Sequence, residues 1–403
     1  MKGLLKTYKF AICLFLTIMP MMAFAQVNII VNIDNQQDSV YYLYKYRGAK
    51  TAIFDTAYCK KGIAWFHNKK SYPEGIYVLT NENRIPLTEI LIGKDQKFSL
   101  RIKDLNDLNS AKVKGAKETD IYFKLMAKLN RTELNISALE NEKGYYPDNV
   151  RKIDSLKKDL AQFEESLKIK KKDAFINLFI NSLKRHGLED YWDDFQLDDE
   201  RILTYPLIDN KLETYFNNLS PDATIINSEI DKLIAKTGNC VETRDYLIWY
   251  FYRKYYSPDY MNLDDIYIHL VDDYFLKIEM ENVSESIVNL MAERAHYLEN
   301  LKLGARIPEI GNIYHIESQY IALVFYDQTC QKCAQEGRIL EEIRARHPEM
   351  TIFPVEIHSV VKENLISLYD IQTTPMIYLL DKNKKIIAKR MKAGQVEQYL
   401  DMD

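Results

Sequence analysis

The sequence has little glycine and proline, with 13 and 11 of these residues among 403. It also lacks a series of long uncharged runs, while 47% of its residues are hydrophobic and 28% are charged. A collagen-like or disordered chain would need far more glycine and proline, or far fewer apolar residues. A multi-pass membrane protein would need several long apolar runs. The composition therefore predicts a globular protein with about two or three domains.

An excess of positive charge is missing too. Lysine and arginine number 54 against 58 aspartates and glutamates, which gives a net charge of −4. A nucleic-acid-binding surface is usually visible as a basic excess, so we expect no nucleic-acid partner. The sequence also has no recognisable phosphate loop, Ser-His-Asp order or paired-carboxylate pattern. We therefore expect neither a small-molecule cofactor nor a bound metal.

Residues 1–25 have the pattern of a cleavable secretory signal. Three lysines precede an uncharged run over residues 10–19, and the small-residue pattern Ala-Phe-Ala follows at 23–25. The run is short for a bilayer, so a permanent helical anchor is the less favoured alternative. Cys13 follows Phe-Ala-Ile inside the run, far too early for a lipoprotein cleavage point, and we expect no lipidation. The pattern predicts export to the periplasm.

Cysteine is scarce, with five residues in the whole chain. Cys13 would leave with the signal, and the three lysines lost with it would shift the net charge to −7, from 51 basic and 58 acidic residues. In an oxidising compartment the remaining cysteines either pair or carry out redox chemistry. Cys59 and Cys240 are isolated in the sequence; they are two buried free thiols, a disulfide pair or separate regulatory thiols. Cys330 and Cys333 are two residues apart.

Residues 26–108 are predicted to form a β-rich domain. Seven short runs of alternating or β-branched residues are separated by turn residues: VNIIVNI, SVYYLYKY, TAIFDTAY, GIAWF, GIYVL, LTEILIG and KFSLRIK. This number of short strands is typical of a β-sandwich or a small barrel. The first domain is therefore expected to be sandwich-like.

Residues 109–303 are predicted to form an all-α domain. Apolar residues recur three and four apart from about Asp120 to Leu139 and again from Ile153 to Leu167, which predicts two antiparallel helices joined by a loop. Residues 246–260 are rich in aromatic side chains. These rings either fill the interfaces of a helical bundle or form a sticky surface for unfolded clients.

Residues 304–403 alternate between strand and helix patterns, which predicts an α/β domain. The unbroken apolar run at 321–326 is typical of a buried strand. The sequence predicts, in order, a helix over 330–346, a strand over 351–357, a helix over 360–369, strands over 376–380 and 386–390, and a last helix from Gln395.

The motif Cys330-Gln-Lys-Cys333 begins the first of these helices, after a short turn. At a helix start, unpaired N–H groups and the helix dipole stabilise a thiolate, and Lys332 adds a nearby cation that should lower the thiol pKa further. The thiolate is the attacking species in disulfide exchange. A permanent structural disulfide and half of a zinc site are the alternatives, although His347 and His358 lack zinc-knuckle spacing.

Residues 304–403 resemble a thioredoxin-fold domain, closest to the periplasmic thiol:disulfide interchange proteins of the TlpA and ResA kind. The resemblance rests on FYDQTCQKCAQE, on Thr374-Pro375, on MIYLLDKNKKII and on Gly394 before the last helix. It implies that Cys330 attacks the substrate disulfide and that Cys333 resolves the mixed disulfide. It also implies that Pro375 is a cis-proline facing the cysteines and that the backbone of Thr374 pairs with the bound substrate.

The resemblance also suggests a role for Glu336, which falls where the ResA branch has an active-site glutamate. On a helix it would point back toward Cys333 and could manage its proton, or it is an exposed residue without a catalytic role. Thr329, where tryptophan is common, and Val324, where ordinary thioredoxins have a buried aspartate, depart from the family pattern. The two regions before residue 304 resemble a β-rich and a helical domain of unknown function that accompany such exported modules.

The sequence thus predicts a signal followed by three domains and a periplasmic thiol:disulfide oxidoreductase whose redox-active group is a Cys330–Cys333 disulfide. Its partners would be periplasmic protein thiols and disulfides, with electrons from a membrane thiol:disulfide donor if it acts as a reductant. The alternative is a cell-envelope binding or assembly protein. In that case the thioredoxin-like module is a scaffold, and its cysteine pair is structural or degenerate.

Overall fold

The computed structural model describes residues 26–36, 38–60, 62–142, 147–184, 186–258, 260–281, 283–358 and 364–402. The expected signal at 1–25, with Cys13, lies outside these described residues. The chain divides into two compact units, Met1–Glu213 and Thr214–Asp403. None of the helices in the described ranges is long and apolar enough to cross a membrane.

The first unit contains one continuous eight-stranded sheet in the order β6-β5-β2-β3-β4-β1-β7-β8. The seven predicted strands are confirmed, and a short eighth strand follows them. Their bounds are β1 Val27–Ile33, β2 Val40–Arg47, β3 Lys50–Lys60, β4 Ile63–Asn68, β5 Gly75–Thr80, β6 Pro86–Ile92, β7 Lys97–Ile102 and β8 Lys112–Lys114.

This sheet differs from the predicted sandwich or barrel, because one strand connects its two halves. The 11-residue strand β3 pairs with β2 over most of its length and with β4 through Cys59 and Lys60. The halves are therefore hydrogen-bonded to each other rather than stacked as separate sheets. Along β1 alternate residues from Val27 to Ile33 are buried, and they belong to one apolar cluster that takes side chains from β1 to β7.

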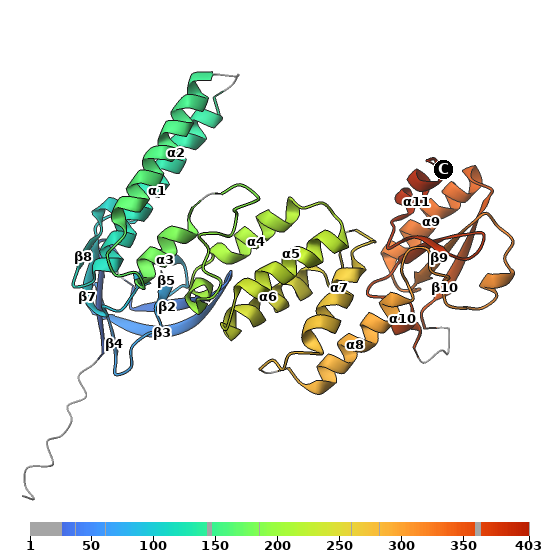
Figure 1. Ribbon diagram of the computed structural model, residues 1–403, viewed down its shortest axis with the longest axis horizontal. Coiled ribbons are helices and arrows are strands. Elements are labelled where there is room, and N and C mark those ends of the chain that lie inside the picture. Colours follow the sequence, from blue (N-terminus) through green and yellow to red (C-terminus); the bar gives the residue numbers. More distant parts are fainter. Residues whose placement is uncertain are drawn as a thin grey trace, which may run out of the picture. The chain divides into compact units, whose positions relative to one another are not determined.

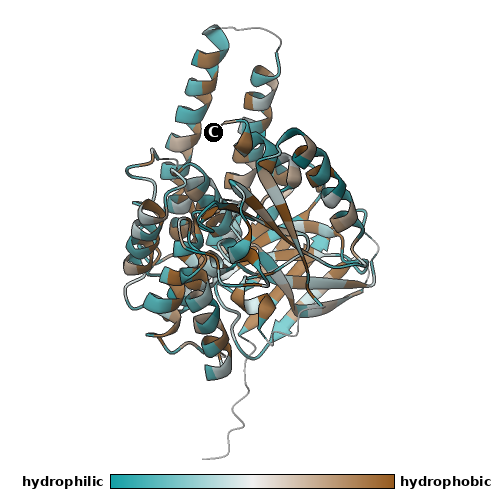
Figure 2. Cartoon of the chain, turned by 90° about the vertical axis from the view of Figure 1, so that its right-hand side faces the viewer, coloured by the Kyte–Doolittle hydropathy of each residue, from teal (hydrophilic) through white to brown (hydrophobic). Residues whose placement is uncertain are grey.

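A helical hairpin follows the sheet, as the apolar spacing predicted. Helices α1 (Lys117–Glu140) and α2 (Pro147–Leu167) lie side by side, and hydrophobic and hydrophilic residues alternate along them (Figures 1 and 2). The expected connecting loop is only partly described, because residues 143–146 lie outside the described ranges. Helix α1 begins three residues before the predicted start and is tied to the sheet by the Thr119 hydroxyl, which donates to Leu91 O at 2.8 Å. The unit also contains α3 (Phe175–Ser182) and two 3₁₀ turns, Leu108–Ser110 and Glu200–Thr204.

The aromatic segment 246–260 mostly fills helix interfaces in the second unit. Tyr246, Phe251 and Tyr255 are buried, whereas Tyr256 and Tyr260 are exposed at the end of the segment. The segment covers the later part of α6 and the start of the connection to α7. The helices here are α5 Ala223–Lys236, α6 Val241–Lys254, α7 Asp264–Leu270 continued by a π-helical turn at Val271–Phe275, and α8 Glu285–Glu299; α4 (Leu207–Asn217) spans the border between the units.

The second unit also contains a four-stranded sheet in the order β10-β9-β11-β12. Strands β9 and β10 are parallel, and β11 is antiparallel to both β9 and β12. Alternate residues of the fully apolar β9 enter two clusters, one of which also contains side chains of α9 and α11. The bounds are β9 Tyr320–Tyr326, β10 Met350–Glu356, β11 Met376–Asp381, β12 Ile386–Lys389, α9 Gln331–Arg346, α10 Leu365–Leu368 and α11 Ala393–Leu400.

These elements agree with the predicted strands and helices to within about two residues, apart from one helix. The helix predicted over 360–369 is described only as α10, because residues 359–363 lie outside the described ranges. Helices α5 to α8 and the four-stranded sheet belong to the same compact unit. The helical segment predicted as one domain over 109–303 therefore contributes elements to both units.

Candidate active site

A short turn after β9 delivers Cys330 to the start of α9. The Asp327 carboxylate accepts hydrogen bonds from the backbone N–H and the hydroxyl of Thr329, both at 2.7 Å. The Cys330 N–H in turn donates to Asp327 O at 3.1 Å. An aspartate that binds the backbone two residues ahead stabilises this type of turn. The turn leaves Cys330 in an extended conformation as the N-cap residue of α9.

The sulfur of Cys330 takes the place of an ordinary capping oxygen. Its Sγ accepts the backbone N–H of Cys333 at 3.1 Å, which satisfies one of the free donors at the helix start. The pKa of the Cys330 thiol is lowered from its ordinary value, first by the hydrogen bond with the Cys333 side chain and then by the backbone N–H groups of Cys333 and Lys332. This arrangement stabilises a thiolate on a partly exposed sulfur.

Cys333 lies one turn further and in a different environment. It is 7% exposed, and the pKa of its thiol is raised, first by burial and then by the hydrogen bond with Cys330. Both cysteines are free thiols in the structure. The pair therefore combines an accessible thiol that ionises easily with a buried thiol that keeps its proton.

The predicted Thr374-Pro375 segment lies against this pair. The Thr374–Pro375 peptide bond is cis, as the resemblance implied. The Cys330 thiol donates to Thr374 O at 3.7 Å, a distance at which sulfur still forms a weak hydrogen bond. The structure thus brings together Cys330, Cys333 and Thr374, although Cys330 and Thr374 are 44 residues apart in the sequence.

Lys332 and Glu336 occupy positions that differ from their expected roles. The Lys332 side chain is exposed, and it is the backbone N–H of this residue that contributes to the lowered pKa of Cys330. The Glu336 carboxylate accepts the backbone N–H of Ala393, the first residue of α11, at 2.7 Å. Within the described residues this bond ties α9 to α11, and Glu336 makes no hydrogen bond to either thiol. Their roles in tuning and proton transfer stay predictions.

Two further residues near Cys330 were not predicted from the sequence. His358 Nε2 lies 3.2 Å from Asp327 Oδ2, and the pKa of the Asp327 carboxyl is lowered, first by its bonds from Thr329 and then by His358. The pattern Asp-x-Thr after a strand could have indicated the Asp327 turn. His358 has no local signal, because it lies 31 residues further along the chain and meets the turn only through the parallel pairing of β9 and β10.

The remaining described cysteines are free thiols rather than a disulfide pair. Cys59 is half-buried in β3, and burial together with the nearby Asp38 and Glu82 raises its pKa to about 11. Cys240 precedes α6, with its Sγ 3.2 Å from the Thr243 hydroxyl. In the described part of the chain, no three His, Cys, Asp or Glu side chains come together as a set of metal ligands.

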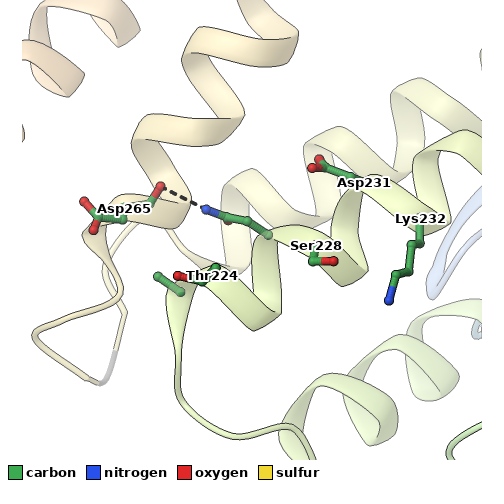
Figure 3. Close-up of a pocket in the computed structure, with 7 residues that line it drawn as sticks. Thr224, Ser228, Asp231, Lys232 and Asp265 are labelled. Carbon is green, nitrogen blue, oxygen red and sulfur yellow. Dashed lines mark hydrogen bonds between the residues drawn. The ribbon is translucent and has the colours of Figure 1, made fainter.

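A recess of about 520 Å³, lined mostly by residues of polar type, lies apart from the cysteines, between α5 and α7 (Figure 3). The Asn227 amide donates to Asp265 O across it at 3.5 Å. Asp231 already accepts hydrogen bonds from His269 and Tyr274. The recess contains no nucleophilic thiol, and it is lined by Ala223, Thr224, Asn227, Ser228, Asp231, Lys232 and Asp265.

Comparison with known proteins finds one matching family and a set of similar solved structures. A family described as Domain of unknown function (DUF4369) matches residues 27–122. A thioredoxin-like protein from Bacteroides caccae is 16% identical, with a TM-score of 0.44, over 58% of this chain and 96% of that one. No curated protein matches the sequence.

Two shorter solved structures are similar to a smaller part of the chain. A domain of a possible thiol-disulfide isomerase from Cytophaga hutchinsonii is 24% identical, with a TM-score of 0.23, over 25% of this chain and 92% of its own. A thiol:disulfide interchange protein from Bacteroides sp. is 19% identical, with a TM-score of 0.23, over 26% of this chain and 90% of its own.

Proposed function

We propose that this protein is a thiol:disulfide oxidoreductase of the thioredoxin type, with Cys330 as the attacking thiolate and Cys333 as the resolving thiol. The position of Cys330 carries the proposal: its Sγ caps α9, accepts the Cys333 N–H and contacts Thr374 O. A partly exposed thiol with a lowered pKa next to a buried thiol with a raised pKa suits a two-step exchange.

In the first step the Cys330 thiolate attacks one sulfur of a client disulfide. A mixed disulfide forms, and the other client sulfur leaves as a thiolate that takes a proton. In the second step Cys333 gives up its proton and attacks Cys330 Sγ, which closes the Cys330–Cys333 disulfide and releases the second client thiol. The client gains two electrons and two protons, and the protein loses them. Thr374 and Pro375 hold the client segment beside Cys330.

We further propose that the reaction takes place in the periplasm and runs in the reductive direction, as in the TlpA and ResA proteins that the C-terminal module resembles. Reduction of successive clients needs an electron source, because each cycle leaves the protein oxidised. A membrane thiol:disulfide donor fits this role. No nucleic acid or small-molecule cofactor takes part in the exchange.

Reduction of insulin disulfides tests this function, with dithiothreitol supplied as the source of electrons. The wild-type protein should accelerate insulin precipitation, and Cys330→Ser should abolish the acceleration because it removes the attacking sulfur. The double variant Cys59→Ser, Cys240→Ser is the matched control and should keep the wild-type rate. An inactive wild-type protein would rule out the proposed activity.

A second candidate function is binding or assembly at the cell envelope, with the C-terminal module as a scaffold. It is favoured by exposed apolar side chains on neighbouring strands of the first unit: Tyr58 of β3 is 80% exposed and Trp65 of β4 is 59% exposed. Exposed aromatic groups of this kind are common at protein interfaces. Full rescue of a deletion strain by a Cys330→Ser, Cys333→Ser chain would favour this function over the redox function.

A further inference from the structure

Five charged side chains are buried together in the second unit. They come from α7, from α8, from the first residue of the loop that leads to Thr374-Pro375 and from the end of β12. Each side chain is at most 14% exposed. Buried charges are unfavourable unless each one is paired. The members are Asp264, Arg294, Asp370, Lys389 and Arg390.

Asp370 is the centre of this ion network. Its two carboxylate oxygens accept from Arg294 Nε at 2.7 Å and from Arg390 Nη2 at 3.0 Å. Arg390 also donates to Asp264 at 2.7 Å, and Lys389 pairs with the other oxygen of Asp264. Lys389 Nζ donates in addition to Leu301 O at 2.6 Å, just after α8. The network therefore joins α7 and α8 to the sheet that carries the cysteine pair.

The network lies at the base of the loop that leads to the cis-proline. Asp370 begins the loop with φ 45°, and Arg390 has φ 58°, both in the left-handed region that few side chains other than those of glycine and asparagine adopt readily. Gln372, two residues further along the loop, donates to Asp370 at 2.8 Å and accepts from the Tyr256 hydroxyl at 3.2 Å. The paired charges thus hold the backbone of the loop in conformations that it would not adopt alone.

Arg294 connects this loop to the aromatic segment of the helices. Its guanidinium carbon lies 3.9 Å from the centre of the Tyr256 ring and 4.5 Å from that of Tyr267. One of its nitrogens donates to Tyr256 O at 2.7 Å. A guanidinium held between two rings and a bidentate carboxylate has a single orientation. Its partner Asp370 is therefore fixed in place as well.

We propose that Arg294 and Asp370 are positioning residues of the redox site, which hold the Thr374-Pro375 loop against Cys330. Neither residue touches the reacting sulfurs. Each acts through the loop, whose Thr374 carbonyl contacts Cys330 Sγ at 3.7 Å. The inference deepens the proposed function and rests on it. It assigns to the helices before residue 304 a part in shaping the site that receives the client.

Alkylation of Cys330 by iodoacetamide as a function of pH tests this proposal on the full chain. The variant Asp370→Asn keeps the shape of the side chain and removes its charge. Loss of an anion by itself would favour the thiolate and lower the alkylation midpoint. Withdrawal of the loop removes the hydrogen bond of the Thr374 side chain, which lowers the pKa of the Cys330 thiol, and should raise the midpoint by about half a pH unit. The sign of the change separates positioning from a direct charge effect.

Hydrogen exchange supplies a second readout that needs no client. In Asp370→Asn the amides of Asp370 and Ile371, which donate to Ser367 O and Ile366 O, should exchange about tenfold faster than in the wild type. The amides of β9 exchange only when the whole unit unfolds, so they report the global stability of the variant separately from local opening of the loop. The matched control is Glu397→Gln, which breaks the Arg346–Glu397 pair between α9 and α11 and should change neither readout.

A raised midpoint with faster exchange supports the proposal, and an unchanged or lowered midpoint in a folded Asp370→Asn protein overturns it. If Asp370→Asn does not fold, the exposed Gln372→Ala variant decides, with the same sign and a smaller change expected. Both readouts are independent of insulin reduction. A wild-type protein that fails to reduce insulin while Asp370→Asn behaves as described counts against the proposed function alone.

Discussion

Cys330 and Cys333 have the same chemical group in opposite environments. Cys330 is partly exposed at a helix start, where hydrogen bonds lower its thiol pKa, whereas Cys333 is buried and its pKa is raised. A thiolate attacks disulfides far faster than a thiol does. The difference between the two sites therefore assigns the first attack to Cys330 and the second to Cys333.

Selective alkylation should show this difference directly. At about pH 7 iodoacetamide should modify Cys330 at least about tenfold faster than Cys333 or Cys59, because only Cys330 has a lowered pKa and a partly exposed sulfur. The rates can be measured for each cysteine by mass spectrometry of the digested protein. Equal rates for Cys330 and Cys59 would contradict the assignment.

Glu336 should contribute to stability through its bond to Ala393. The change Glu336→Ala removes the acceptor at the start of α11 and should lower the free energy of unfolding by about 1 kcal/mol, measured in urea. Glu336→Gln keeps an acceptor oxygen and should retain most of this stability. A Glu336→Gln protein of normal stability whose thiol titration changes would instead support the proton-transfer role.

At the scale of single residues, the sequence predicted those site residues that belong to a short local motif. The two-residue spacing of the cysteines and the Thr374-Pro375 pair were visible in the sequence, and the structure places them in contact. The bond of Glu336 to Ala393 spans 57 residues, and that of His358 to Asp327 spans 31. No spacing rule connects such residues, because each pair meets only once the sheet and helices have packed.

The loop from Asp370 to Pro375 joins α10 to β11 and depends on charged groups from other elements. Burial by itself raises the pKa of the Asp370 carboxyl, but the hydrogen bond from Arg294 and the charges of Arg294 and Arg390 lower it overall. A carboxyl whose folded pKa is depressed stabilises the fold above its unfolded pKa, at about 3.9 for aspartate. This contribution is lost as the pH falls through the lower folded value.

The second unit should therefore lose stability on acidification partly through Asp370. At neutral pH Asp370→Asn should destabilise it by about 3 to 5 kcal/mol, because two arginines lose a buried partner. The difference between wild type and variant should shrink as the pH is lowered from about 5 to about 2. Urea unfolding at several pH values measures it, and a difference that stays constant would contradict the role of this carboxylate.

The order of elements in the second unit was largely predictable, whereas some of their partners were not. An unbroken apolar run such as β9 must be buried on both faces, and alternating strands and helices imply a layered sheet. In the first unit each strand was visible as a short run, but strand order is a non-local property. The pairing of β3 with both β2 and β4, which makes one sheet of two halves, has no local signal.

At the scale of the whole molecule, helices α5 to α8 and the cysteine-bearing sheet form one compact unit from Thr214 to Asp403. The sequence predicted a border at residue 304, where glycine and proline begin the α/β pattern. The sequence pattern changes at that position, but the ion network joins residues on both sides of it. Arg390 and Asp264, for example, are 126 residues apart. Interactions of this kind decide which segments fold together.

Truncation should reveal this dependence. A fragment of residues 304–403 retains Asp370, Lys389 and Arg390 but loses Asp264 and Arg294, so it should unfold non-cooperatively or aggregate. A fragment of residues 214–403 keeps all five charges and should unfold cooperatively. Circular dichroism during urea unfolding compares the two. A cooperative transition of equal midpoint in the shorter fragment would show that the helices are dispensable for folding.

The most direct test of the central claim is capture of the mixed disulfide. Cys333→Ala removes the resolving thiol, so Cys330 should remain covalently bound to a client, visible as adducts on non-reducing gels that disappear with dithiothreitol. Cys330→Ala should form no such adducts, and Cys240→Ser in the Cys333→Ala background should leave them unchanged. Adducts that depend on Cys330 and accumulate only without Cys333 are the predicted result. Their absence from Cys333→Ala, or their persistence in Cys330→Ala, would contradict the account.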